Sequence, residues 1–94
     1  MFTLSIEKVN EINPLVADAI KLSEESGDTF KSAYYKKNDG WAISFQGLMS
    51  RHNIKRFLDN SAKAVNRDSS EDHFDIDNNS EVINERTVIY IATL

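Results

Sequence analysis

The chain has no cysteine and, among its 94 residues, only one proline and three glycines. Without cysteine there can be no disulfide, thiolate metal site or cysteine nucleophile, and a secreted fold held by disulfides is unexpected. No run of apolar residues approaches the roughly 18 that a membrane-spanning helix needs, and the first residues lack the basic and apolar regions of a secretory signal. We therefore expect a cytoplasmic protein that does not bind membranes.

The residue types that build catalytic and metal sites are also few. The two histidines, His52 and His73, are not spaced as in metal-binding motifs. The glycines at positions 27, 40 and 47 are explained by a helix end, a turn and a strand end, so none is left for a phosphate-binding loop. We therefore predict that the chain is not an enzyme, has no catalytic residues and binds neither a metal nor another cofactor.

Hydrophobic residues make up 40% of the sequence, which is enough to form the core of a single domain over residues 1–94. Alternating apolar and polar residues over 2–7 predict a first strand. Asn13-Pro14 and Gly27 carry the signals for the two ends of a helix over roughly 14–26. Ser50 marks the start of a second helix, which is amphipathic and basic.

The elements together predict an α+β sandwich, with two helices packed on one face of a mostly antiparallel sheet. Their order is β-α-β-β-α-(β)-β, where the bracketed strand is the short alternating segment 74–76. The last strand is the β-branched run 87–94, which is typical of a strand at the sheet centre or covered on both faces. A ferredoxin-like arrangement with an acidic hairpin inserted between residues 68 and 85 is the simplest topology.

The segments 29–37 and 41–47 flank Asn38-Asp39-Gly40, a strong hairpin signal. A two-residue type I′ turn at Asp39-Gly40 pairs Tyr34 with Phe45. One face of the hairpin then carries Phe30, Tyr34, Trp41, Ile43 and Phe45, and the other carries Lys31, Tyr35, Lys37, Ser44 and Gln46. A three-residue loop would instead place Tyr35 beside Ile43 and pair Lys37 with Trp41. We prefer the two-residue turn because it separates apolar from charged residues better.

Charge is divided along the chain into three segments. Residues 1–30 have two basic and six acidic residues, a net charge of −4. Residues 31–67 have eight basic and two acidic residues, a net +6, and residues 68–94 have one basic and seven acidic residues, a net −6. Two surfaces of opposite charge can attract two different kinds of partner.

The acidic end of the chain provides the first candidate surface. Its acidic residues follow each other closely in the sequence. Such a segment forms either a solvated loop or a surface that mimics a phosphate backbone towards a basic protein. The candidate partner-binding residues are Asp68, Glu71, Asp72, Asp75, Asp77 and Glu81.

The basic middle of the chain provides the second candidate surface. Lysine and arginine side chains could contact phosphates, and a tyrosine ring could stack on a base. The candidate nucleic-acid-binding residues are Lys31, Tyr35, Lys37, Arg51, Lys55, Lys63 and Arg67.

We hypothesise a non-enzymatic inhibitor or regulator that docks its acidic surface on a protein partner with a basic surface. The small size of the chain and its many Asn, Lys, Ile, Asp and Ser residues suit a phage-type inhibitor of a host or defence protein. The alternative is a domain that binds single-stranded RNA or DNA through the basic 31–67 segment. No pattern in the sequence indicates an oligomeric state.

Overall fold

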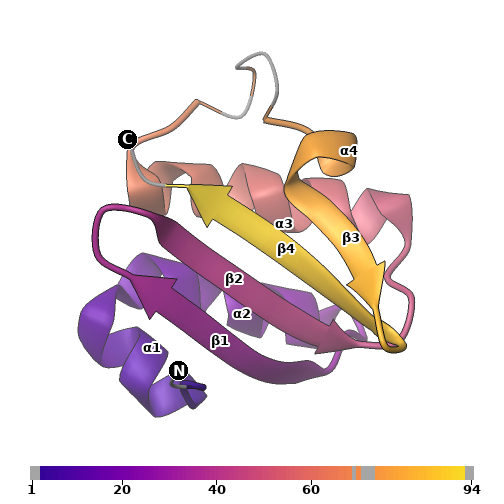
Figure 1. The fold of residues 1–94 in the computed structure, drawn as a ribbon, viewed down its shortest axis with the longest axis horizontal. Coiled ribbons are helices and arrows are strands. Elements are labelled where there is room, and N and C mark those ends of the chain that lie inside the picture. The colour runs from indigo at the N-terminus through magenta and orange to yellow at the C-terminus, as the bar shows by residue number, and fades with distance from the viewer. Residues whose placement is uncertain (1–2, 69, 71–73, 93–94) are drawn as a thin grey trace.

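The computed structural model describes residues 3–68, 70 and 74–92. It shows an α+β domain in which α1, α2 and α3 cover one face of a four-stranded antiparallel sheet (Figure 1). The elements are α1 (Ile6–Ile12), α2 (Pro14–Glu25), β1 (Phe30–Lys36), β2 (Gly40–Gln46), α3 (Arg51–Ala62), the 3-10 turn η1 (Lys63–Val65), α4 (Ile76–Asn79), β3 (Ser80–Ile83) and β4 (Arg86–Ala92). The predicted α+β class with a mostly antiparallel sheet is confirmed.

The N-terminal strand predicted over residues 2–7 is wrong at its end, because Ile6 and Glu7 begin the helix α1, and Phe2 lies outside the described residues. The Ser5 side chain accepts a hydrogen bond from the Lys8 backbone N–H at 3.4 Å and so caps α1. Leu4 contributes only a single bridge to Ala33 of β1. A ferredoxin-like sheet would need a strand from this segment. The order among the described strands is β1-β2-β4-β3, with every pairing antiparallel.

The predicted helix ends are confirmed. Asn13 accepts a hydrogen bond from the Leu15 N–H at 3.1 Å and precedes the N1 proline of α2. Gly27, with a φ of +101°, follows the end of α2, where the left-handed conformation suits glycine. Ser50 accepts a hydrogen bond from the Asn53 N–H at 3.1 Å and caps α3.

The register of the β1–β2 hairpin differs from the predicted register. Lys36 pairs with Gly40, so the loop has three residues, 37–39, and not two. Tyr34 pairs with Ala42 and Tyr35 with Trp41, which also differs from the three-residue alternative considered above. The physical reason is the backbone at the turn: Asn38, with a φ of +74°, takes the left-handed conformation that was expected only at Asp39 and Gly40.

A register shift between Phe30 and Ser32 changes the faces of β1 further. Phe30 stays with Phe45 on the face towards the helices, as predicted, and their rings are 6.3 Å apart. Tyr35 joins this inner face and packs on Trp41 at a ring distance of 4.6 Å. Tyr34 lies on the outer face, opposite to the prediction, together with Ser44 of β2.

The C-terminal part also combines a confirmed and a corrected element. The predicted terminal strand is present as β4, and it lies between β2 and β3 inside the sheet. The short strand predicted at 74–76 is wrong: Ile76 starts α4, because the Asp75 side chain caps this helix by accepting a hydrogen bond from the Asn78 N–H at 2.9 Å. Phe74 is buried in the core. The fourth strand is instead β3.

The core lies between the inner face of the sheet and the helices. Phe45 is at its centre, and its ring contacts the Phe57 ring of α3 at 5.3 Å. Ile43, Ile89 and Ile91 extend this layer across β2 and β4. Because α1, α2 and α3 all lie on this side, no described helix covers the opposite face of the sheet.

Candidate interaction surface

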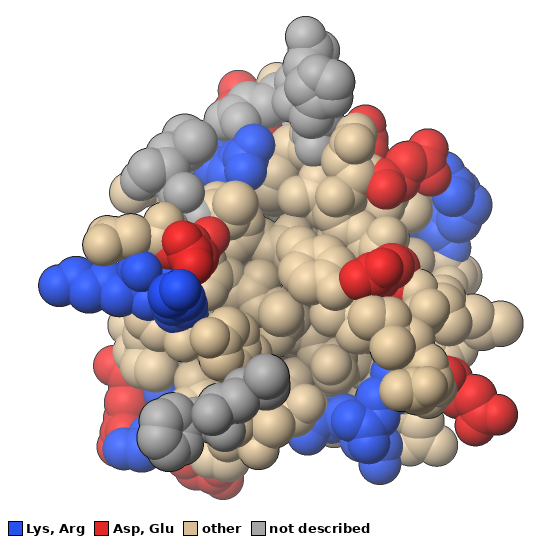
Figure 2. Space-filling view, in the orientation of Figure 1, with Lys and Arg blue, Asp and Glu red and all other residues tan. Residues whose placement is uncertain are grey.

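The outer face of the sheet has no described helix across it (Figure 1). Directly paired residues of antiparallel strands point to the same face. Figure 2 views this face and shows a largely uncharged centre, with most charged side chains around its margin. Two rows of paired residues cross it: Tyr34, Ala42 and Tyr90 in one row, and Ser32, Ser44, Val88 and Glu81 in the other.

The first row forms the most distinct feature of this face. Ala42 of β2 lies between Tyr34 of β1 and Tyr90 of β4, so the two tyrosines stand two strand spacings, about 10 Å, apart. A small residue between two large rings leaves a gap. This gap is a mainly apolar hollow of about 230 Å³, which we call the Tyr34–Tyr90 slot. Its lining residues are Tyr34, Lys36, Asp39, Gly40, Trp41, Ala42, Tyr90 and Ala92.

Charged groups border the slot on two sides. At the hairpin, Lys36 and Asp39 form an ion pair at 3.5 Å. On the side of β3, the Tyr90 hydroxyl donates a hydrogen bond to the Glu81 carboxylate. This bond, together with partial burial and the negative charge of Glu81, raises the pKa of Tyr90 to about 12. At neutral pH Tyr90 is therefore protonated, and the bond holds its side chain beside the slot.

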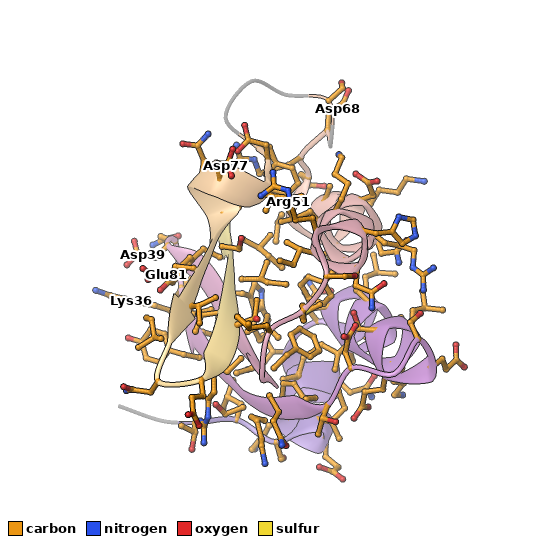
Figure 3. All side chains as sticks on the ribbon, turned by 90° about the vertical axis from the view of Figure 1, so that its right-hand side faces the viewer. Lys36, Asp39, Arg51, Asp68, Asp77 and Glu81 are labelled. Atoms are coloured by element: carbon orange, nitrogen blue, oxygen red, sulfur yellow. The ribbon has the colours of Figure 1, made fainter. Side chains whose placement is uncertain are left out.

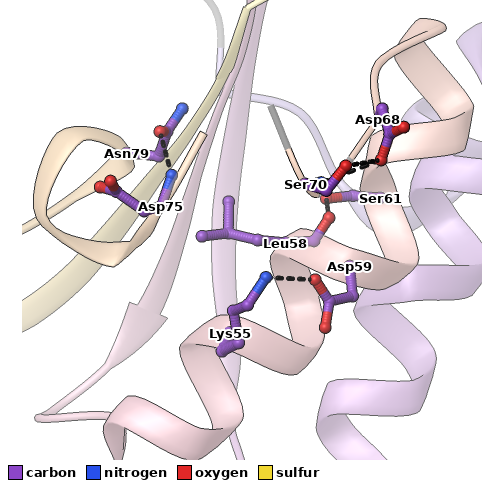
Figure 4. Close-up of polar contacts among 8 residues, drawn as sticks. All are labelled: Lys55, Leu58, Asp59, Ser61, Asp68, Ser70, Asp75 and Asn79. Carbon is purple, nitrogen blue, oxygen red and sulfur yellow. Dashed lines mark hydrogen bonds and ion pairs between the residues drawn. The ribbon is translucent and has the colours of Figure 1, made fainter. Parts of the chain in front are cut away.

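The described acidic candidates do not form one continuous cluster. Figure 3 shows Asp77 and Glu81 along α4 and β3, with Asp68 apart from them. Asp77 forms an ion pair with Arg51 at 3.4 Å, and both side chains are exposed. Asp75 caps α4, while its own backbone N–H donates to the Asn79 side chain at 3.1 Å (Figure 4). Two further predicted members, Glu71 and Asp72, lie outside the described residues.

Asp68 has a local role of its own. Its carboxylate accepts hydrogen bonds from the Ser70 backbone N–H at 2.9 Å and from the Ser70 hydroxyl at 2.8 Å (Figure 4). These bonds to the ionised form lower the pKa of Asp68. Asp68 is therefore ionised at neutral pH.

The basic candidates are divided among several parts of the surface. Lys31 and Lys37 lie on β1 and its hairpin loop, where both are exposed. Arg51 and Lys55 belong to α3, on the other side of the sheet, and Lys55 pairs with Asp59 at 2.7 Å (Figure 4). Lys63 is in η1. This division separates the hairpin cations from those of the helix.

Two further candidates for nucleic-acid binding, Tyr35 and Arg67, pack against other residues of the domain. Tyr35 is half-buried against Trp41, so its ring is not on the exposed sheet face as predicted. The Arg67 guanidinium lies 4.7 Å from the centre of the Phe74 ring and donates to the Ala92 carbonyl at 3.5 Å. The aromatic side chains on the outer face of the sheet are instead Tyr34, which is exposed, and Tyr90, which is half-buried, and the sequence prediction missed both. The alternation of inward Ile89 with outward Tyr90 could have indicated one of them.

Within residues 3–68, 70 and 74–92, no three or more histidine, aspartate or glutamate side chains are grouped so that they could hold a metal ion. Nor does any helix in this part of the chain combine the length and apolar character needed to cross a membrane. No family model, curated protein or solved structure matches the chain. Its own surface is therefore the starting point for a functional proposal.

Proposed function

We propose that the chain is a non-enzymatic binding protein that docks a protein partner on the outer face of its sheet, with the Tyr34–Tyr90 slot at the centre of the interface. The observation that carries this proposal is the row Tyr34–Ala42–Tyr90 on an open sheet face. Aromatic side chains in fully covered pockets supply much of the energy of protein interfaces. An uncharged centre with charges around it is also the usual anatomy of such a surface.

The charge beside the slot favours a partner with a basic surface. β3 and β4 belong to the segment 68–94, whose net charge is −6. Glu81 lies on the outer face next to Tyr90. An apolar or aromatic side chain of the partner would fill the slot, and a neighbouring basic residue would approach Glu81. Charges at the rim of an interface mainly increase the rate of association and select between partners.

A protein that binds in this way acts by occupying its partner's surface, as an inhibitor or regulator does. The sequence-based hypothesis of a phage-type inhibitor of a host or defence protein is compatible with this mode and stays a hypothesis. The nucleic-acid alternative has less support from the described residues. Tyr35 packs inwards, and the hairpin cations are separated from those of α3.

The test compares capture of partners from a lysate of the native host by the wild-type chain and by slot variants. Tyr34→Ala removes one wall of the slot, and Ala42→Tyr fills it. Leu22→Ala, which removes an exposed apolar side chain from α2, is the matched control. Proteins captured after nuclease treatment are identified by mass spectrometry, purified, and titrated against each variant by calorimetry.

We expect the control to bind the purified partner like the wild type and each slot variant to bind at least about 30-fold more weakly, the range of an interface hot spot. Equal binding by Tyr34→Ala and the wild type would exclude the slot. Loss of binding only in Asp75→Asn or Asp77→Asn would favour α4 as the docking site. Capture that disappears with nuclease would favour nucleic acid.

A further inference from the structure

The two edges of the sheet differ in how their backbone groups are covered. On the β1 edge, Leu4 donates to the Ala33 carbonyl at 2.7 Å and accepts from the Ala33 N–H at 3.3 Å. On the β3 edge, β4 is the sole partner that the described residues provide. Figure 3 looks onto this open edge. An open strand edge is a template on which another strand can pair.

The turn that joins β3 to β4 determines which groups of β3 face outwards. Asn84 and Glu85 both have positive φ, +50° and +63°, as a two-residue type I′ turn requires. Ile83 and Arg86 therefore form the hydrogen-bonded pair next to the turn. Because such pairs alternate along antiparallel strands, Val82 has its N–H and C=O directed away from β4. The open edge thus presents one donor and one acceptor at Val82.

Apolar side chains surround this point. Val82 is 56% exposed, Ile83 41% and Leu48 79%. The two neighbours of Leu48 in the chain are bonded to Thr87, the β4 residue that pairs with Val82: the Thr87 hydroxyl donates to the Gly47 carbonyl at 2.7 Å and accepts from the Met49 N–H at 3.0 Å. Exposed aliphatic side chains next to the unpaired edge of a strand favour association with another strand.

We propose that two copies of the chain pair antiparallel through β3, which joins their sheets into one of eight strands, four from each copy. A two-fold axis at Val82 would place Val82 opposite the same residue of the second copy, so that the two exchange both hydrogen bonds. Leu48 of each copy would lie near this central pair and lose its exposure to water.

Charge supports a second copy as the occupant. In the register centred on Val82, Glu81 lies opposite Ile83 of the other copy, and no like charges are paired directly. A register centred on Glu81 would oppose two carboxylates, and the backbone groups of Glu81 already face β4. At the same side of the molecule, Arg51 and Asp77 balance each other within one copy. The edge is therefore self-complementary in the register centred on Val82.

The test is sedimentation equilibrium of the whole chain over about 10 µM to 1 mM, a range suited to a small interface. Val82→Lys places a charge at the centre of the edge, and Leu48→Lys tests the same interface from the loop. Leu22→Lys on α2 makes the same change to an exposed residue elsewhere. Circular dichroism confirms that each variant is folded.

We expect a monomer–dimer equilibrium that both edge variants weaken at least about tenfold and that the control leaves unchanged. Hydrogen exchange of the Val82 amide should also slow as the wild-type concentration rises, whereas that of Glu81 should be slow throughout. A wild type that stays monomeric to 1 mM would overturn the proposal. A dimer that is unaffected by Val82→Lys, or in which the Val82 amide exchanges at a constant rate, would do the same.

Discussion

Thr87 is the buried polar residue with the clearest energetic role, and its replacement by valine gives a quantitative test of the structure. Thr87 is 1% exposed on β4. Its hydroxyl donates to the Gly47 carbonyl and accepts from the Met49 N–H, so it fixes the loop between β2 and α3. Valine has nearly the same shape but lacks the hydroxyl, and Thr87→Val therefore removes two hydrogen bonds with little change in volume.

The expected loss follows from the burial of the two groups left behind. A hydrogen bond contributes about 0.5–1.5 kcal/mol net, but a buried donor or acceptor without a partner costs about 1–3 kcal/mol. Met49 is 8% exposed, so water reaches its N–H poorly, whereas Gly47 is half-buried and its carbonyl can be partly hydrated. We therefore expect Thr87→Val to lower the free energy of unfolding by about 2–3 kcal/mol.

Urea unfolding followed by the fluorescence of Trp41, the one tryptophan of the chain, measures this change. Trp41 is buried, so its emission should shift when the core opens. Thr87→Ser keeps the hydroxyl and should lose only about 1 kcal/mol, for one buried methyl group. Thr29→Val, at an exposed position, should change stability by less than about 0.5 kcal/mol. A Thr87→Val variant within about 0.5 kcal/mol of the wild type would refute the role assigned to the hydroxyl.

Two further predictions concern the hairpins. Because the folded-state pKa of Tyr90 is raised from 10.0 to about 12, its contribution to the free energy of unfolding is fully present below pH 10 and is lost as the pH rises towards 12. Urea unfolding at pH 9 and 11.5 measures this change. After allowance for solvent screening at this partly exposed site, the free energy of unfolding should fall between these pH values by about 1 kcal/mol more in the wild type than in Tyr90→Phe. Equal decreases would contradict the Tyr90–Glu81 bond. Gly40 has a φ of +117°, which valine rarely adopts, so Gly40→Val should lower the free energy of unfolding by about 1–3 kcal/mol, and an unchanged urea midpoint would contradict this backbone conformation.

Local signals in the sequence predicted the helices best. Asn13, Ser50 and Gly27 each act through groups a few residues away, so their roles could be inferred without knowledge of the fold. The same kind of signal was overlooked at two places. Ser5 caps α1 and Asp75 caps α4, although the apolar alternation around each favoured a strand. Two or three apolar residues in alternation, as at 74–76 and 2–7, are too few to decide between the helix and strand periods when a cap is present.

The face of each tyrosine could not be predicted, because it depends on the register of pairing. A shift of one residue moves every side chain of a strand to the other face. The irregularity after Phe30 and the left-handed Asn38 together determine that Tyr34, and not Tyr35, is on the open face. The type I′ geometry expected at Asp39-Gly40 occurs instead at Asn84-Glu85, where the dipeptide gives a much weaker signal. The Tyr34–Tyr90 slot therefore could not be predicted from the sequence.

The two proposed surfaces use different residues of one sheet, which makes them separable by experiment. Tyr34 and Ala42 contribute to the slot but lie two strands or more from the open edge, whereas Val82 and Leu48 contribute to the edge but not to the slot. Pairing through β3 would extend the outer face without covering it, because added strands lie in the plane of the sheet. A dimer would then present two slots on one continuous face, and a partner with two matching sites would bind it more tightly than either slot alone.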